Sequence, residues 1–402
     1  MLKKDNFFKS YFDNSSKYNR NIKKTKKVFN SFLADLKNHK IPLLGSFEKD
    51  YKFDFSKSVV KEYSKYKNII VIGMGGSILG TKSIYSFLKK RIKKEVFFFD
   101  NLDSNLYLKY KTINNLKNSC FIVVSKSGNT LETITNLGTV FSEKLVKNKL
   151  IIITEITDNA LMAIANKYHA EIIEHKEFVG GRYSVLSETG MFPAALMGLN
   201  LTKFKNLKDL IKNKNFVSSL IQNVAGIYTL NSKKINNSVI LSYDSSLDDL
   251  GYWYQQLVAE SLGKQGKGIN PILSFGPKDH HSLLQLYLDG PKDKFFTFFN
   301  SSKKGNKLKG TQDIIPTNMR FLKNKNLQFI INAQCKATKN IFKLRKIPFR
   351  QITFNDKNEN ELGEIFTFFV LETILLSRLM NVNPFDQPAV EQVKVETKKF
   401  LR

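Results

Sequence analysis

The sequence is poor in cysteine, with two among its 402 residues. Cys120 and Cys335 each stand beside an apolar run, so we expect buried free thiols rather than a disulfide framework or a metal cluster. Long hydrophobic runs are also missing, because the longest apolar helical stretch, residues 365–380, is interrupted by Glu372 and Arg378. No apolar leader with a small-residue cleavage site follows the first methionine. We therefore expect a cytoplasmic protein with no membrane partner.

Acidic residues are scarce, since 35 aspartates and glutamates accompany 64 lysines and arginines and the net charge is +29. Such a charge would suit a protein that binds nucleic acid or an anionic membrane. The basic residues are, however, spread from end to end, and no compact basic block is interleaved with aromatic residues. We interpret the charge as a bias of composition, and we expect no nucleic-acid partner.

The length of the chain and its hydrophobic content of 42% suit more than one core. Short apolar runs alternate with segments of helical spacing, which is typical of α/β proteins with parallel sheets covered on both faces. We predict a helical N-terminal arm at 1–50, two doubly wound parallel-sheet domains at 51–202 and 203–382, and a C-terminal helix at 383–402. The predicted strands are residues 69–72, 96–99, 121–124, 150–154 and 171–174, then 239–243, 295–299, 327–332 and 351–354.

A loop of hydroxyl groups lies between the apolar strand 121–124 and a helix that starts at Leu131. Its glycine, Gly128, can adopt the positive φ that an anion-binding turn often needs. A helix N-terminus adds unpaired backbone N–H groups and a partial positive charge. The segment therefore predicts a receptor for a phosphate monoester, although an ordinary hydroxyl-rich helix cap would look the same. The candidate ligands are Ser125, Lys126, Ser127, Thr130 and Thr133.

Two glycine-rich loops also follow predicted strands. Residues 73–80 miss the dinucleotide pattern G-x-G-x-x-G because Ile78 occupies its third glycine position, so a close approach of Gly76 and Ser77 to a small polar ligand fits better. In the second loop, paired glycines that include Gly181 precede Arg182, whose guanidinium suits a developing oxyanion. The alternatives are a tight packing turn for the first loop and an exposed arginine for the second.

The remaining candidates are a glutamate, a histidine pair and a C-terminal lysine. On the predicted helix 248–262, Gln256 and Glu260 share one face, although a lone glutamate is usually a solvated surface charge. His280 and His281 stand in a turn at a helix start. Adjacent residues point in different directions and no further metal ligands accompany them, so acid–base work by one histidine is favoured over metal binding. Gln387 and Lys394 lie two turns apart on the last helix, which is a weak signal in so basic a chain.

Together these motifs resemble those of the glucose-6-phosphate isomerase (phosphoglucose isomerase) family, whose members contain two sugar-isomerase (SIS) α/β domains. The likeness extends over some 320 residues in the family's order. It departs from the family at 276–280, where members have Gly-Thr-x-x-Gln before the catalytic histidine. The matching segments are residues 73–80, 125–133, 180–187, 259–264, 279–291 and 387–394.

The resemblance implies a site for each part of the substrate. The loop 125–130 with Thr133 would bind the sugar phosphate, and Gly76 with Ser77 would lie around the sugar. The hydroxyls would be positioned by Gln256 and Gln387.

The resemblance also implies a catalytic role for four side chains. Glu260 would move a proton between C1 and C2 through a cis-enediol, while Arg182 stabilises the enediolate. His281, assisted by Lys394, would open the sugar ring, and in the family this histidine comes from the other subunit of a homodimer. The implied activity is the reversible isomerisation of glucose 6-phosphate and fructose 6-phosphate, a step of glycolysis and gluconeogenesis, with no cofactor or metal.

Two alternatives stay open. A relaxed isomerase would also accept mannose 6-phosphate. A non-catalytic SIS sensor would keep the phosphate loop but would leave four residues without a role, namely Arg182, Glu260, His281 and Lys394.

Overall fold

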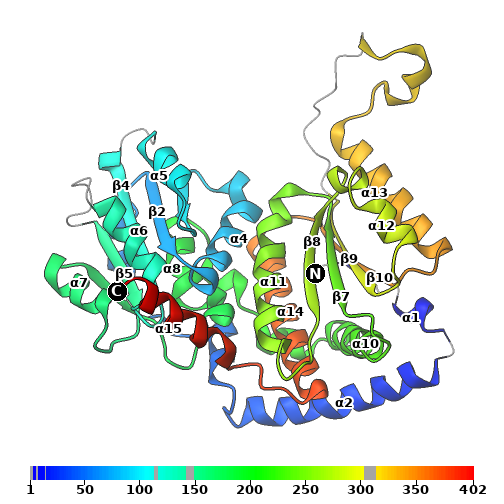
Figure 1. Cartoon of the computed structure of the whole chain (residues 1–402), viewed down its shortest axis with the longest axis horizontal. Helices are drawn as coiled ribbons and strands as arrows, with labels where there is room; N and C mark the ends of the chain where they lie inside the picture. Colours follow the sequence, from blue (N-terminus) through cyan, green and yellow to red (C-terminus); the bar gives the residue numbers. More distant parts are fainter. Residues whose placement is uncertain (1–2, 6–7, 14, 113–115, 142–148, 303–313) are drawn as a thin grey trace.

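The structure is a computed structural model that describes residues 3–5, 8–13, 15–112, 116–141, 149–302 and 314–402. Two five-stranded sheets form its framework (Figure 1). The first has the strand order β3-β2-β4-β5-β6 and the second the order β1-β10-β9-β7-β8. Helices lie on both faces of the sheets, and the predicted α/β class is confirmed.

The first sheet is entirely parallel. Strands β2, β4 and β5 are buried along their whole length, as their continuous apolar runs predict. Because β3 pairs with one side of β2 and β4 with the other, the loops after β2 and β4 diverge and open a crevice at their carboxyl ends. The strands are β2 (Asn68–Gly73), β3 (Glu95–Phe99), β4 (Ser119–Val124), β5 (Leu150–Thr154) and β6 (Glu171–Glu174).

The second sheet is parallel except at one edge. There β1, from the N-terminal arm, pairs with β10 in the antiparallel direction, so the prediction of a wholly parallel sheet is wrong for this edge and the arm is not wholly helical. The sequence around β1 is too short and polar to carry a strand signal of its own. The strands are β1 (Lys3–Asp5), β7 (Asn237–Ser242), β8 (Asn270–Phe275), β9 (Lys294–Ser301) and β10 (Phe349–Phe354).

Helices α4 and α11 form the contact between the two sheets, and α14 lies beside α11 (Figure 1). The arm helix α2 packs on α10 and α14, so the arm completes the core of the second sheet. The helices that belong to the first sheet are α3 (Lys57–Tyr63), α4 (Leu79–Leu88), α5 (Ser104–Lys111), α6 (Leu131–Phe141), α7 (Ala160–Tyr168) and α8 (Glu188–Leu196). The others are α1 (Phe8–Tyr11), α2 (Ser16–Lys37), α9 (Leu207–Lys212), α10 (Lys214–Asn231), α11 (Asp248–Leu262), α12 (Leu284–Asp289), α13 (Leu327–Leu344), α14 (Glu359–Met380) and α15 (Glu391–Phe400).

Two predictions about the second sheet are wrong. The strand predicted at 327–332 is the first part of α13, whose N-terminus is capped by Asn326 and whose buried residues recur every three to four positions. A short apolar run at a helix start looks like a strand when the later spacing is ignored. Strand β8 is absent from the predicted strands. It contains Pro271, which is tolerated because β8 is an edge strand.

The two charges that interrupt the apolar stretch are both paired. Glu372 forms a two-pronged ion pair with Arg350, one prong of which joins Oε1 to Nη2 at 2.9 Å, and both residues are 2% exposed or less. Arg378 instead pairs with the partly exposed Asp35 at 2.8 Å. Within the described part of the chain, no helix combines the length and the apolar character needed to cross a membrane. The two cysteines are free and buried, as predicted.

We expect Glu372→Leu to lower the free energy of unfolding by about 3–5 kcal/mol, because it leaves the Arg350 guanidinium buried and unpaired. The double variant Arg350→Met/Glu372→Leu should recover most of this loss. Urea titration measures each value, with Arg378→Met as the control for a partly exposed pair, expected to cost about 1 kcal/mol or less. A single variant no less stable than the control would contradict the prediction.

Candidate active site

A cavity of about 800 Å³ opens at the carboxyl ends of β2 and β4, where the loops of the first sheet diverge. Segments from the second sheet and from the C-terminus complete its wall, so residues more than 300 positions apart meet there. The predicted site residues on the wall are Gly76, Ser77, Lys126, Ser127, Thr130, Gly181, Arg182, Gln256, Glu260, Gln387 and Lys394.

The hydroxyl loop turns directly after β4. Gly128 has φ +66°, and a Cβ there would lie 1.9 Å from the side-chain oxygen of Asn159, which caps α7. Ser125 is buried behind the wall and its Oγ lies 2.8 Å from Thr130 Oγ1, so it holds a wall residue in place. Thr133 is also buried behind the wall, and its hydroxyl has no hydrogen-bond partner in the described residues.

The two glycine loops touch through their backbones. A Cβ on Gly76 would lie 2.2 Å from the carbonyl carbon of Gly181, and the Ser184 hydroxyl donates to the Gly76 carbonyl at 3.2 Å. A Cβ on Gly75 would lie 2.8 Å from Gln256 Nε2. The glycines therefore allow the first loop to contact both the second loop and α11. A turn that only packed against its own sheet would not need these two contacts.

Arg182 is buried, with 4% of its surface exposed, so the alternative of an exposed arginine is wrong. Its Nε donates to Ser261 Oγ at 3.0 Å, and its Nη1 donates to Glu260 Oε2 at 3.1 Å and to Gln387 Oε1 at 2.9 Å. One guanidinium thus joins the second glycine loop, α11 and the C-terminal segment. Its fixed fork of donors faces the cavity beside a carboxylate.

Glu260 is not the solvated surface charge that a lone glutamate suggests. It lies in the last turn of α11, where Gln256 Nε2 donates to its Oε1 at 2.8 Å while Arg182 binds its Oε2. About 29% of its side chain is exposed, and that part lies on the cavity wall. A half-buried carboxylate with both oxygens oriented is suited to exchange a proton with a bound ligand.

Each cation of the cavity already has a carboxylate partner on the same wall. Lys126 lies 3.5 Å from Glu155, and Arg182 lies 3.1 Å from Glu260. The third pair joins Lys394 to Glu391 at 2.5 Å. Lys126 also donates to the Glu177 carbonyl at 2.6 Å, so one of its three protons is fixed in the wall and the others can serve an anion.

The C-terminal segment 383–387 reaches the cavity through donors that bind its backbone. Arg182 Nη2 and the Tyr183 hydroxyl both donate to the Pro384 carbonyl, and Arg182 also donates to the Asp386 carbonyl at 2.9 Å. Lys264 pairs with the Asp386 carboxylate at 2.8 Å. From this anchor the short 3₁₀ turn Pro388–Val390 leads into α15, which runs back toward the first sheet (Figure 1).

Sequence reasoning missed one side of the wall. His175 is 2% exposed there, with Nδ1 3.3 Å from the Lys176 carbonyl, and burial lowers the pKa of His175 to about 4, so its ring is neutral. Most of the missed residues follow β5 and β6, so the rule that ligands collect at the carboxyl ends of parallel strands could have found them. They are Met74, Glu155, Ile156, Thr157, Glu174, His175, Glu177 and Glu391.

His281 is not on this wall. It lies in the turn that follows β8, where it is exposed to solvent. Among the predicted catalytic residues, the structure therefore brings together Glu260, Arg182 and Lys394, and it leaves His281 apart from them in the same chain.

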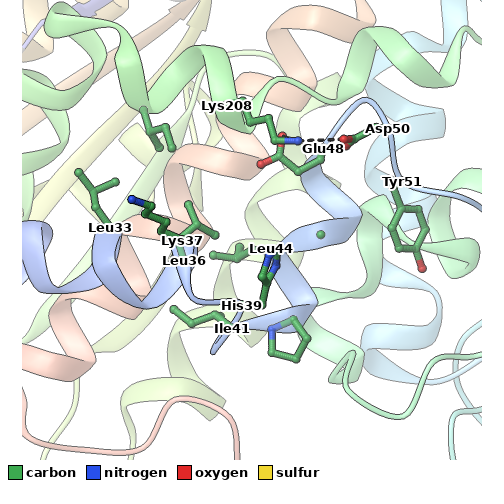
Figure 2. A pocket seen from close by; sticks show the side chains of 13 residues that line it. Leu33, Leu36, Lys37, His39, Ile41, Leu44, Glu48, Asp50, Tyr51 and Lys208 are labelled. Carbon is green, nitrogen blue, oxygen red and sulfur yellow. Dashed lines mark hydrogen bonds and ion pairs between the residues drawn. The ribbon is translucent and has the colours of Figure 1, made fainter.

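A second cavity, of about 470 Å³, lies between α2, the turn Pro42–Phe47 and α9 (Figure 2). Leu33, Leu36 and Leu44 give it an apolar floor, and the Lys208–Asp50 ion pair of 2.9 Å stands at its rim. None of the predicted site residues lines it, so the candidate active site is the larger cavity.

Comparisons with known proteins show which family the chain is similar to. A family model described as phosphoglucose isomerase matches residues 52–290. The chain is 35% identical to a glucose-6-phosphate isomerase of Methanocaldococcus jannaschii over 86% of this chain and 87% of that protein. It is 31% identical to a glucose-6-phosphate isomerase of Campylobacter jejuni, with 87% and 88% covered.

Solved structures share the fold. A hypothetical protein of Thermus thermophilus superposes with a TM-score of 0.85 at 23% identity, and both chains are covered completely. A glucose-6-phosphate isomerase of Chlamydia trachomatis gives a TM-score of 0.71 at 18% identity, covering 86% of this chain and 71% of that one.

We expect Gly76→Ala to disrupt the cavity, because its new Cβ would meet backbone atoms that cannot move aside. Overpacking of this kind costs about 1–3 kcal/mol, which should appear as a lower melting temperature. Affinity for glucose 6-phosphate, measured by calorimetry, should fall about tenfold for each 1.4 kcal/mol of binding free energy that is lost. The control is Gly45→Ala, where no atom lies within 4 Å of the added Cβ, and equal behaviour of the two variants would refute the prediction.

Proposed function

Because the chain belongs to the phosphoglucose isomerase family, we propose how its cavity performs the reversible isomerisation of glucose 6-phosphate and fructose 6-phosphate. The protein is an aldose–ketose isomerase. The observation that carries the mechanism is the convergence of Glu260, Gln256 and Arg182 on the wall of a cavity that the hydroxyl loop also lines.

The phosphate group binds at the hydroxyl loop. Ser127 and Thr130 offer hydroxyl donors, and Lys126 offers a full charge, at the N-terminus of α6. Gly76 and Ser77 lie on the wall nearer to α11, as expected for residues beside the sugar. Binding of the phosphate at this loop holds the open-chain sugar in the cavity with C1 and C2 near Glu260.

The proton transfer is assigned to Glu260. Starting from the aldose, its carboxylate removes the proton from C2, and the electrons of that bond form an enediolate with negative charge on O1. Arg182 Nη1, which contacts Glu260 itself, supplies the positive charge that stabilises this oxygen. Glu260 then returns the proton to C1, and the hydroxyl proton moves from O2 to O1, which leaves the ketose.

Ring opening is assigned to His281 and Lys394. His281 is exposed and absent from the cavity wall of its own chain, while Lys394 lies on that wall. A second copy of the chain would bring its histidine to the cavity, so we propose a homodimer with two shared sites. We also propose a cytoplasmic location. Both cysteines are buried and free, as is usual for proteins of a reducing compartment.

Replacing Glu260 by glutamine should lower kcat by about 10²- to 10⁴-fold, the usual contribution of a general base, while sugar-phosphate binding persists. Turnover of fructose 6-phosphate in deuterated water, followed by NMR, should show deuterium at C2 of the product for the wild-type protein and very slow incorporation for the variant. The control is Glu396→Gln on α15, an exposed glutamate paired with Lys399. A Glu260→Gln rate equal to that of the control would remove Glu260 from the mechanism.

Mixing two impaired variants tests the shared site. In a dimer of one Glu260→Gln chain and one His281→Asn chain, one of the two sites receives both native residues. After subunit exchange, random pairing makes half of the dimers hybrid, so about a quarter of wild-type activity should return. If each site uses the histidine of its own chain, mixing restores no activity beyond that of the separate variants.

A further inference from the structure

The turn between β8 and α12 places two adjacent histidines in different surroundings. The His280 ring points into its own chain, where its Nε2 lies 2.6 Å from Tyr243 Oη and the two rings meet edge to face. The next residue, His281, is exposed. Of the pair, only His281 is free to meet a substrate held by another chain.

A directional chain of hydrogen bonds holds His280. Tyr243 Oη donates to Thr338 Oγ1 at 3.0 Å, and Thr338 in turn donates to the Gln334 carbonyl at 2.9 Å. Since the single hydroxyl proton of Tyr243 is used by Thr338, the contact with His280 requires an N–H on Nε2. His280 therefore acts as a donor, and its acceptor Tyr243 directly follows β7 and is held by Thr338 of α13.

Asp279 holds the other side of the same turn. Its Oδ2 accepts from the Phe275 backbone N–H at 2.7 Å and from Ser274 Oγ at 2.9 Å, and its Oδ1 accepts from Ser282 Oγ at 2.9 Å. Burial alone would raise the pKa of Asp279, but these hydrogen bonds outweigh it and the pKa is lowered. The carboxylate thus ties the end of β8 to the residue that follows His281.

The turn also rests directly on the aromatic core of the sheet. A Cβ on Gly276 would lie 2.7 Å from the Tyr243 ring, so the backbone touches the ring face. Tyr243 is 1% exposed and stacks on Phe298 with an interplanar angle of 11°. The support under His281 is therefore a rigid part of the fold.

We propose that Tyr243, Asp279 and His280 are positioning residues that fix the backbone under His281 for ring opening in the partner's cavity. The proposal rests on the ring-opening role assigned to His281 above. An exposed side chain on a loose turn would lose conformational freedom each time it acted, whereas a turn anchored at both ends leaves only the side-chain torsions of His281 to be ordered.

Tyr243→Phe removes only the hydroxyl that anchors His280. We expect kcat for glucose 6-phosphate to fall about three- to tenfold with little change in KM, as a small misplacement of a reacting group would cause. His280→Leu should show the same loss, whereas His280→Gln, which keeps an N–H donor, should restore the wild-type rate. The matched control is Tyr252→Phe, which alters an exposed tyrosine of α11.

A double-mutant cycle separates positioning from general damage. If the Tyr243 hydroxyl acts through His281, Tyr243→Phe should have no further effect in the His281→Asn background. Two outcomes would overturn the proposal while leaving the role of His281 intact. In one, Tyr243→Phe causes an equal loss of rate in both backgrounds. In the other, Tyr243→Phe and His280→Leu keep the full rate while His281→Asn is slow. A wild-type rate for His281→Asn itself would instead remove the ring-opening assignment on which the proposal rests.

Discussion

The Arg182 guanidinium is the interaction on which the rest of the site depends. It comes from the loop after the first sheet, contacts Glu260 and Ser261 on α11 of the second, and binds the backbone of the C-terminal segment. A buried guanidinium must be satisfied on nearly all of its donors, and here the acceptors come from two distant parts of the chain, α11 and the C-terminal segment. The same requirement that stabilises the buried charge therefore assembles the cavity. Glu260 and the positive charge beside it are held together before any substrate arrives, which is the preorganisation that the proposed enediolate chemistry needs.

Charge has different consequences on the surface and in the cavity. The chain carries a net charge of +29, yet the cations on the cavity wall stand beside carboxylates of the same wall. An anion that enters does not meet a bare positive patch, so it must share Lys126 with Glu155 and rely on hydroxyl and backbone donors for the rest of its binding energy. Such a site discriminates by geometry more than by charge. The surface charge can still concentrate phosphorylated ligands near the protein, as a long-range effect that salt weakens.

Local patterns predicted the fold and many of the site residues, because they concern short segments. The strand, hydroxyl loop and helix around Ser125 are all present, and the central strands of the first sheet show continuous apolar runs. What could not be predicted depends on contacts between distant residues. Glu260 looks like a surface charge until Arg182, 78 positions away, is placed beside it. His175 carries no motif, and its burial follows only from the position of β6 in the sheet. The misassigned strand 327–332 shows the opposite error, in which a local apolar run was given more weight than the longer helical spacing of α13.

The two chemical steps are assigned to parts of the structure that differ in rigidity. The groups for proton transfer, Glu260 and Arg182, lie on the packed contact between the sheets, where backbone and side chains are fixed by buried hydrogen bonds. The groups for ring opening lie on elements that face solvent, since every residue of α15 is exposed and His281 stands on an outward turn. Ring opening moves a proton between oxygen atoms and tolerates water, whereas the enediolate is stabilised only where water is replaced by fixed donors. The exposed groups still need a defined position, and each has an anchor in its own chain. Lys394 has the Lys264–Asp386 pair near the start of its segment, and His281 has the buried Tyr243 under its turn. The side chains of Lys394 and His281 therefore keep their conformational freedom, while the backbone that carries them is anchored.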